Sequence, residues 1–244
     1  MNKPSYLTDN DWNLLKKKYR NLRPVIRKLR KNYPVQYLIG NVDFYGYEID
    51  VKKGVLIPRF ETETLLEKTI ELLKKYDMTD TSVLDIGTGS GCIPIVLKKE
   101  LKDLTVTTID KSGKALKIAK HNAKKHKADI TFIHKSVYSY RPINKYGLII
   151  SNPPYIAEDE EVDPQTKYEP KMALYAKHDG LEFYEHIIKN AKNMLQEKSI
   201  LAFEIGCTQG DYLVEFAKDY FPNAIISIEQ DLYERDRYLF IINE

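Results

Sequence analysis

Cysteine is scarce in this sequence, and that scarcity excludes several kinds of site. The 244 residues hold two cysteines, Cys92 and Cys207, whose separation fits no metal-ligand or redox spacing. We interpret both as small apolar side chains of a protein in a reducing compartment. The five histidines form no zinc-type pair of ligands, so the sequence predicts no metal site.

Long hydrophobic runs and a strong charge imbalance are also missing. No segment approaches the roughly 18 consecutive apolar residues that a membrane span needs, and the amino terminus lacks the apolar core of a signal peptide. The net charge is only +3, which gives no general reason to expect DNA binding. We therefore expect a cytoplasmic, monomeric protein with no membrane partner and no direct contact with DNA.

Beyond about residue 80, strand-like and helix-like segments alternate. Strands are predicted over 82–87, 105–110, 130–134, 147–151, 199–205, 224–229 and 237–242, and helices over 92–101, 112–126, 180–196 and 209–219. Such alternation is typical of an α/β fold, in which helices cover both faces of an open, mostly parallel sheet. Ligands of these folds bind outside the carboxyl ends of the strands.

The first 80 residues or so are organised differently. Residues 13–31 carry nine Lys or Arg and no acid, and Pro24 divides them into two short helices or a helix and a turn. This basic stretch is either a solvated face or a docking surface for an acidic or nucleic-acid-rich partner. A β-hairpin is predicted over 44–51, before a helix that reaches about Lys75. We divide the chain into a basic helical segment (1–33), a hairpin linker (34–56) and a larger α/β domain (57–244).

A strand-like apolar run over 147–150 ends at a proline-rich turn, Asn152-Pro153-Pro154-Tyr155. The turn brings an amide side chain, a rigid backbone carbonyl and a flat ring into one small space. Two acceptors in that space can hold both protons of a planar NH2 group and aim its nitrogen at a second reactant. Taken alone, the same four residues also fit a rigid turn without chemistry.

A glycine-rich turn follows the first strand of the predicted sheet. Its pattern, Asp-x-Gly-x-Gly-x-Gly, contains Asp85, Gly87, Thr88, Gly89, Ser90 and Gly91. Glycine lets the backbone turn sharply and approach a ligand closely. The spacing differs from the dinucleotide fingerprint G-x-G-x-x-G. Pro94 fits the following helix only in its first turn, so we expect that helix to begin near Gly91.

Asp110 ends the second predicted strand, where a carboxylate can accept both hydroxyls of a ribose. Together with the two turns, it resembles the donor site of class I S-adenosylmethionine-dependent methyltransferases, whose Rossmann-like fold has a mostly parallel, seven-stranded sheet. In those enzymes an acid after the third strand binds the adenine amino group and an apolar residue follows it; Ser136 and Val137 stand there in this sequence. The resemblance implies that Val137 and Asn152 contact the donor, and that Asp85 receives backbone or donor amino hydrogens and is not a general base. A nucleotide-binding α/β domain of another kind is the alternative.

Further matches make the resemblance more specific. From about residue 34 to its end, the sequence is similar to the protein glutamine methyltransferases that modify peptide chain release factors. The matching segments, besides the glycine turn, are Pro34–Gly40, Phe44–Gly46, Ile57–Arg59, Glu61–Glu63, Asn152–Ile156, Glu169-Pro170, Asp179–Leu181, Glu204–Gly206, Asp231-Leu232 and Asp236-Arg237. Adenine amino-methyltransferases share the Asn-Pro-Pro-Tyr turn, whereas the Ile-Pro-Arg segment is particular to the glutamine enzymes. Phe44 and Arg59 either line the crevice or serve packing and ion pairing.

The resemblance implies a donor, a substrate and a mechanism. S-adenosylmethionine is the expected donor, and the expected acceptor is the glutamine of the Gly-Gly-Gln motif in class 1 release factors, whose methylation modulates translation termination. Asn152 through its side-chain oxygen and Pro153 through its carbonyl would hold the two amide protons. Tyr155 would stack against the amide plane, and Pro154 would complete the substrate site. Positioning, rather than a strong base, is the expected catalytic contribution.

Three alternatives remain open from the sequence. A glutamine of a ribosomal protein is the nearest, because it differs only in the docking surface. Methylation of adenine in nucleic acid is another, against which the small net charge and the lack of an added recognition domain argue. A binding module without activity is the third. Relatives of this type usually carry a longer helical amino-terminal domain, so we expect the 33 or so residues before Pro34 to grip the partner in an abbreviated way.

Overall fold

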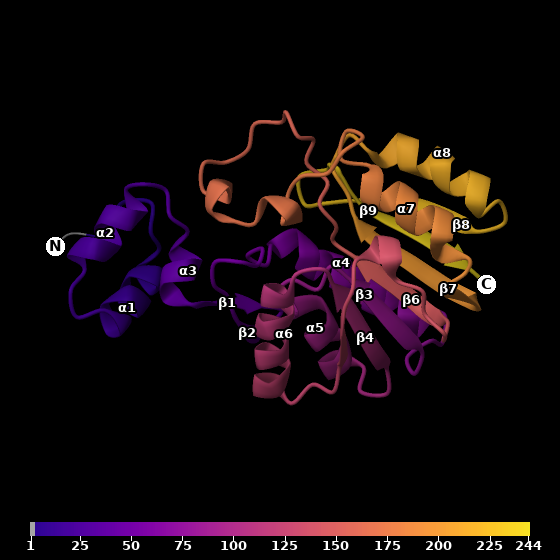
Figure 1. The fold of residues 1–244 in the computed structure, drawn as a ribbon, viewed down its shortest axis with the longest axis horizontal. Helices are drawn as coiled ribbons and strands as arrows, with labels where there is room; N and C mark the ends of the chain where they lie inside the picture. Colours follow the sequence, from indigo (N-terminus) through magenta and orange to yellow (C-terminus); the bar gives the residue numbers. More distant parts are fainter. Residues whose placement is uncertain (1–2) are drawn as a thin grey trace.

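A seven-stranded sheet runs through the centre of the structure (Figure 1). The computed structural model describes residues 3–244, so Met1 and Asn2 of the predicted basic segment lie outside the described residues. The strand order is β5-β4-β3-β6-β7-β9-β8, and all neighbours are parallel except those of β9. The strands are β3 (Ser82–Ile86), β4 (Thr105–Asp110), β5 (Thr131–His134), β6 (Tyr146–Ser151), β7 (Leu195–Glu204), β8 (Ile225–Gln230) and β9 (Asp236–Asn243). The predicted α/β fold with a mostly parallel, seven-stranded sheet is confirmed.

Two hydrophobic cores lie on opposite faces of this sheet, because its central strands are buried on both sides. Along β3, Val83 belongs to one core and Leu84 to the other, as the alternation of side chains along a strand requires. The helices of the first core are α4 (Phe60–Lys75), α5 (Cys92–Glu100) and α6 (Gly113–His126), and those of the second are α7 (Glu182–Ala191) and α8 (Gly210–Tyr220). This layering leaves the carboxyl ends of the parallel strands at one edge.

The helix predicted over 180–196 is too long at its carboxyl end, because α7 ends at Ala191. Leu195 instead begins β7 and pairs with Tyr146 of β6, whose N–H donates to the carbonyl of Met194 at 2.8 Å. Both Met194 and Leu195 are buried in that pairing, so tertiary packing overrides the local helical pattern. The remaining predicted helices and strands of the sheet region occur with ends shifted by a few residues.

The amino-terminal helices form a small layer at one end of the molecule (Figure 1). They are α1 (Asp9–Lys18), α2 (Arg23–Leu29) and α3 (Val35–Ile39). Pro24 lies in the first turn of α2, which decides the earlier alternative in favour of two helices. Their apolar side chains make a third core from Leu7, Trp12, Leu15, Val25, Leu29, Leu38 and Ile39. Helix α3 was not predicted from the sequence, and the division of the chain at residues 33 and 56 stays a prediction.

A β-hairpin links this layer to the sheet domain. Its strands are β1 (Asn41–Phe44) and β2 (Tyr47–Asp50), so it begins a little earlier than predicted. Tyr45 and Gly46 form the two-residue turn with φ of 53° and 75°, as this class of hairpin requires. Asn122 of α6 holds the hairpin, because its side chain accepts from the N–H of Asp50 and donates to the Asp50 carbonyl, both at 3.0 Å.

A long irregular segment joins β6 to α7. It contains the short 3-10 helices η2 (Thr166–Tyr168) and η3 (Lys171–Ala173), while a third, η1 (Val137–Ser139), follows β5. The Tyr168 hydroxyl donates to the carbonyl of Lys31 at 2.6 Å, so this segment touches the amino-terminal layer. None of the helices within residues 3–244 combines the length and the apolar character of a membrane span.

Candidate active site

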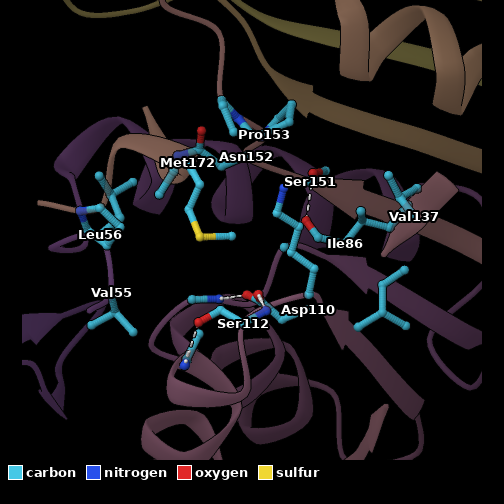
Figure 2. Close-up of a pocket in the computed structure, with 18 of the residues that line it drawn as sticks. Val55, Leu56, Ile86, Asp110, Ser112, Val137, Ser151, Asn152, Pro153 and Met172 are labelled. Carbon is cyan, nitrogen blue, oxygen red and sulfur yellow. Dashed lines mark hydrogen bonds between the residues drawn. The ribbon is translucent and has the colours of Figure 1, made fainter. Parts of the chain in front are cut away.

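A pocket opens where the carboxyl ends of β3, β4 and β6 meet (Figure 2). Parallel strands present these ends at one edge of the sheet, so segments far apart in the sequence converge there. The pocket is lined by Gly54, Val55, Leu56, Ile86, Gly87, Gly89, Ile109, Asp110, Lys111, Ser112, Ala115, Lys135, Ser136, Val137, Ser151, Asn152, Pro153, Pro154, Pro170, Met172, Ala173 and Phe183. Both turns singled out from the sequence contribute to this one pocket.

The glycine turn has the backbone that its sequence demands. Gly87, Gly89 and Gly91 have φ of 80°, 55° and 85°, in the left-handed region that favours glycine. Gly87 and Gly89 line the pocket, where their lack of a side chain exposes the backbone. Gly91 serves packing instead, because a Cβ there would lie 3.0 Å from the Cβ of Ala119 on α6. The predicted donor contact of Gly91 stays a prediction.

Polar groups without partners lie beneath this turn. Asp85 is fully buried, and its Oδ2 accepts from the Thr108 hydroxyl at 2.7 Å. Its Oδ1 and the hydroxyls of Thr88 and Ser90 have no hydrogen-bond partner within residues 3–244. Buried polar atoms are nearly always paired. The Thr88 hydroxyl is close enough to Asp85 to lower the pKa of its carboxyl, so a water or a bound group would only complete the partners of these atoms. None of the three residues lines the pocket directly, and their contact with a donor stays a prediction.

Burial also changes the acidity of Asp85. It raises the pKa of the carboxyl to about 7, against the opposing effect of the hydrogen bond from Thr108. A group so deeply placed, with no opening to the pocket, is poorly situated to take a proton from a substrate. The local role expected for Asp85 stays a prediction.

Asp110 lies at the end of β4 and faces the pocket (Figure 2). Its Oδ2 accepts from the Gly89 N–H at 3.0 Å and its Oδ1 from the Ser112 N–H at 2.7 Å. Burial raises its pKa, and these two hydrogen bonds oppose the shift. A carboxylate has about four acceptor positions, so lone pairs remain for two hydroxyls of a ligand. The same carboxylate thus fixes the glycine turn and keeps acceptor positions for a ligand, while its contact with a ribose stays a prediction.

The far wall of the pocket is largely apolar. Ile109, Val137 and Phe183 contribute to it, which suits a flat ring such as adenine. Ser136 also lines the pocket, but its hydroxyl accepts from the Tyr138 N–H at 3.4 Å and caps η1. No carboxylate stands at this position, so a ring amino group there meets a neutral acceptor.

The Asn152 side chain has a defined orientation. Its Nδ2 lies 2.9 Å from the Thr62 hydroxyl and 2.9 Å from Glu204 Oε2, so the NH2 group donates to both atoms. Among residues 3–244, nothing donates to its Oδ1 or to the carbonyl of Pro153. Asn152, Pro153 and Pro154 all line the pocket. Neighbouring residues of the turn thus each keep a free acceptor, and their grip on an NH2 group stays a prediction.

Tyr155 sits behind the pocket wall. Its hydroxyl donates to Glu204 Oε1 at 3.3 Å, and its backbone carbonyl accepts from Gln209 Nε2 at 3.1 Å. The ring packs against the second hydrophobic core and is not among the pocket-lining residues. Stacking of Tyr155 on a substrate amide stays a prediction.

Glu204 is a residue of the site that the sequence reasoning missed. It is buried at the end of β7, and its carboxylate accepts from Asn152, from Tyr155 and, at 2.6 Å, from the Thr62 hydroxyl. Burial raises its pKa to about 7. The sequence did contain a signal for Glu204, because it is an acid directly after the apolar run Ile200–Phe203. Strands β4 and β6 of the same sheet are likewise ended or followed by candidate site residues.

The structure also resolves the alternatives for Phe44 and Arg59. Phe44 is 1% exposed and belongs to the first core. Arg59 forms an ion pair with Glu169, whose other oxygen accepts from the Ile57 N–H at 3.0 Å. Pro170, next to Glu169, lines the pocket. The ion pair thus holds the long segment against the start of α4, where it closes one side of the pocket.

The histidines and cysteines take no part in this site. Within the described part of the chain, no three His, Cys, Asp or Glu side chains lie together in a way that could hold a metal ion. Cys92 is buried in α5 and Cys207 is exposed.

Comparisons with known proteins all find methyltransferases. The family described as "Methyltransferase small domain" matches residues 61–168. A release factor glutamine methyltransferase of Bacillus anthracis is 40% identical over 221 residues, which is 88% of this chain and 78% of that protein. One of Lactococcus lactis is 35% identical over 244 residues, covering 99% of this chain and 89% of that protein.

Solved structures extend the comparison to three dimensions. The protein-(glutamine-N5) methyltransferase (release factor-specific) of Alicyclobacillus acidocaldarius is 25% identical with a TM-score of 0.51, over 80% of this chain and 99% of that one. A ribosomal protein L11 methylase of Lactobacillus delbrueckii, at 20% identity, shares the fold with a TM-score of 0.59 over 80% and 85% of the two chains. On the identity and coverage of its relatives, the chain belongs to the release factor glutamine methyltransferase family.

Proposed function

We propose that this chain methylates the side-chain amide nitrogen of the glutamine in the Gly-Gly-Gln motif of class 1 peptide chain release factors, and so modulates translation termination. Relatives that carry this name support the reaction and the substrate class. The single observation that carries the proposal is the pair of free acceptors, Asn152 Oδ1 and the Pro153 carbonyl, at a pocket fit for a nucleoside.

The methyl donor is S-adenosylmethionine, which supplies a methyl group already activated on a sulfonium. Asp110 would accept the ribose hydroxyls, and the backbone at Gly87 and Gly89 would allow the donor to approach closely. Val137 would pack on the adenine ring and Ser136 would meet its amino group. The unpaired polar atoms of Asp85, Thr88 and Ser90 fit the amino-acid end of the donor or a water that bridges to it.

On the acceptor side, Asn152 and Pro153 would hold the two protons of the glutamine amide. An amide nitrogen is a weak nucleophile because its lone pair is delocalised, so its plane and direction must be fixed. Orientation of this kind can contribute on the order of 7–11 kcal/mol to lowering a barrier. No base needs to act first, because the nitrogen becomes acidic only after it has gained the methyl group and can then lose its proton to water.

A surface outside the pocket would set the choice of partner. The exposed basic side chains of residues 13–31 are a candidate docking surface for the release factor. We take the enzyme to act in the cytoplasm as a monomer, without direct binding to DNA. The three-part division of the chain at residues 33 and 56 belongs to the same proposal.

The test is methyl transfer from labelled S-adenosylmethionine to a purified release factor, beside a copy whose Gly-Gly-Gln glutamine is replaced by alanine. We expect label on the first protein and none on the second. Label on both would show that a residue other than this glutamine is methylated. No label on either, with donor binding intact by calorimetry, would reject the proposal in favour of a ribosomal protein or nucleic acid.

A further inference from the structure

Thr62 and Glu204 meet the Asn152 side chain on the side away from the free Oδ1. They come from α4 and β7, and they surround Asn152 Nδ2 at 2.9 Å each. A side-chain amide can turn by 180°, which exchanges its two donor protons for its acceptor oxygen. After such a rotation, the NH2 group of Asn152 would face the NH2 group of the substrate amide, and no acceptor would be offered to it. The grip on a substrate NH2 group therefore depends on the contacts that prevent the Asn152 amide from rotating by 180°.

When Glu204 is ionised, both neighbours can only accept from Asn152. The one proton of the Thr62 hydroxyl is donated to Glu204 Oε2 at 2.6 Å, which leaves Thr62 only lone pairs for Asn152. An ionised carboxylate has no proton to give. A turned Asn152 would thus bring its oxygen against two other acceptors inside the protein, where such a mismatch is costly.

From this geometry we infer that Glu204 and Thr62 are positioning residues, which lock the Asn152 amide so that Oδ1 faces the acceptor nitrogen. The consequence for methyl transfer rests on the proposed function. The orientation itself is a property of the free protein and can be measured without any substrate.

The charge of Glu204 has a second effect. A negative charge hydrogen-bonded to Asn152 Nδ2 polarises the amide and makes its Oδ1 a stronger acceptor. This matters most as the substrate nitrogen gains positive charge during methyl transfer. The groups facing the carboxylate are Arg237 and Tyr155, which favour its charged form, and Glu61, which opposes it. Because burial raises the pKa of Glu204 to about 7, the ionised form grows as the pH increases through that value.

Thr62→Val removes the hydroxyl while keeping the shape of the side chain. We expect kcat to fall about tenfold or more, since misplaced reacting groups are slowed by up to about 100-fold. The donor KM should hold, because Thr62 does not line the pocket. Thr62→Ser should rescue most of the loss. Thr69→Val is the matched control, since Thr69 is also buried on α4 but bonds only to the Leu65 carbonyl.

The orientation is measured by NMR of 15N-labelled protein without substrate, with the Asn152 side-chain signal identified by its loss in Asn152→Ala. We expect both amide protons to exchange slowly compared with those of the exposed Asn223. Thr62→Val should speed that exchange and Thr69→Val should not. Fast exchange in the unaltered protein, or no change in Thr62→Val, would overturn the inference.

Glu204→Gln tests the charge separately. A Gln oxygen can still accept from Asn152 and Thr62, so slow exchange should persist while the rise of kcat through about pH 7 disappears. A rise that persists in Glu204→Gln would contradict the role of the charge.

The two proposals fail in distinguishable ways. If exchange is slow and depends on Thr62 but release factors are not methylated, the proposed substrate is wrong and the positioning role of Thr62 and Glu204 stands. If release factors are methylated but the Asn152 amide protons exchange fast, the proposed substrate stands and the positioning role is wrong.

Discussion

The two halves of the pocket are built in different ways. The polar contacts of the donor half come mainly from the glycine turn and one carboxylate, with Gly89 bonded to Asp110 across 21 positions that contain α5 and β4. The acceptor half depends on side chains from three distant segments, and its Thr62–Glu204 contact joins residues 142 positions apart. A donor half of this type is specified locally, whereas the acceptor half exists only once α4, β6 and β7 have packed together.

The two halves of the pocket should respond differently to substitutions. Donor binding should tolerate changes on α4 and β7, while the orientation of the acceptor should respond to them. Changes in the two halves should therefore separate donor affinity from kcat.

The largest expected effect is that of Asn152→Ala on the acceptor half. This change removes the oxygen that grips the substrate amide, so methyl transfer should fall to background. Donor affinity by calorimetry should stay close to that of the unaltered protein, as should that of the exposed control Asn223→Ala. Equal loss of donor binding and transfer in Asn152→Ala would make the residue structural and would erase the proposed separation.

Asp110→Ala tests the donor half. It leaves the ribose hydroxyls without acceptors and frees the Gly89 N–H, so donor binding should weaken by roughly 1–3 kcal/mol. Asp103→Ala is the matched control, because Asp103 is an exposed acid just before the same strand. Unchanged donor affinity in Asp110→Ala would remove this residue from the site.

Asp85 gives a pH-dependent prediction for stability. Its folded-state pKa, about 7, lies above the ordinary 3.8, so the fold favours the neutral carboxyl. That stabilisation is complete below a pH of about 4 and is lost as the pH rises through about 7.

Asp85→Asn removes that titration. The Tm of the variant, measured relative to that of the unaltered protein by thermal melts, should therefore rise between about pH 5 and pH 8. A Tm difference that stays constant with pH would show that Asp85 is not held neutral by its burial.

The smallest expected effect concerns the basic stretch outside both halves. Arg27→Ala combined with Arg30→Ala removes two exposed charges from the amino-terminal layer. If this surface docks the release factor, the KM for that substrate should rise a few-fold at low salt and the difference should vanish at high salt.

Lys102→Ala with Lys198→Ala is the control, since it removes the same charge from exposed positions near the opposite edge of the sheet. Equal effects of the two pairs would indicate a general charge effect, and no effect of either would favour a solvated face.

The same contrast explains what the sequence could predict. The glycine turn, Asp110 and the Asn-Pro-Pro-Tyr turn are patterns whose physical demands are local, and residues of each line the same pocket. Helix α3 is too short for its pattern to be distinguished. The end of α7 was misplaced because pairing of Leu195 with β6 decides it.

Glu204 and Thr62 were not assigned roles for a related reason. Each lies in a segment that matches the family, but their function follows from meeting each other and Asn152 in space. A carboxylate at the end of a buried strand signals only that some partner must exist. The partners are fixed by strand order and by the packing of α4 on β7.

The most direct test is mass spectrometry of the Gly-Gly-Gln peptide from a release factor incubated with S-adenosylmethionine and either the unaltered protein or Asn152→Ala. We expect one added methyl group on the glutamine with the unaltered protein and none with the variant, although both bind the donor. An unmodified peptide in both samples, or equal methylation by both proteins, would contradict this expectation.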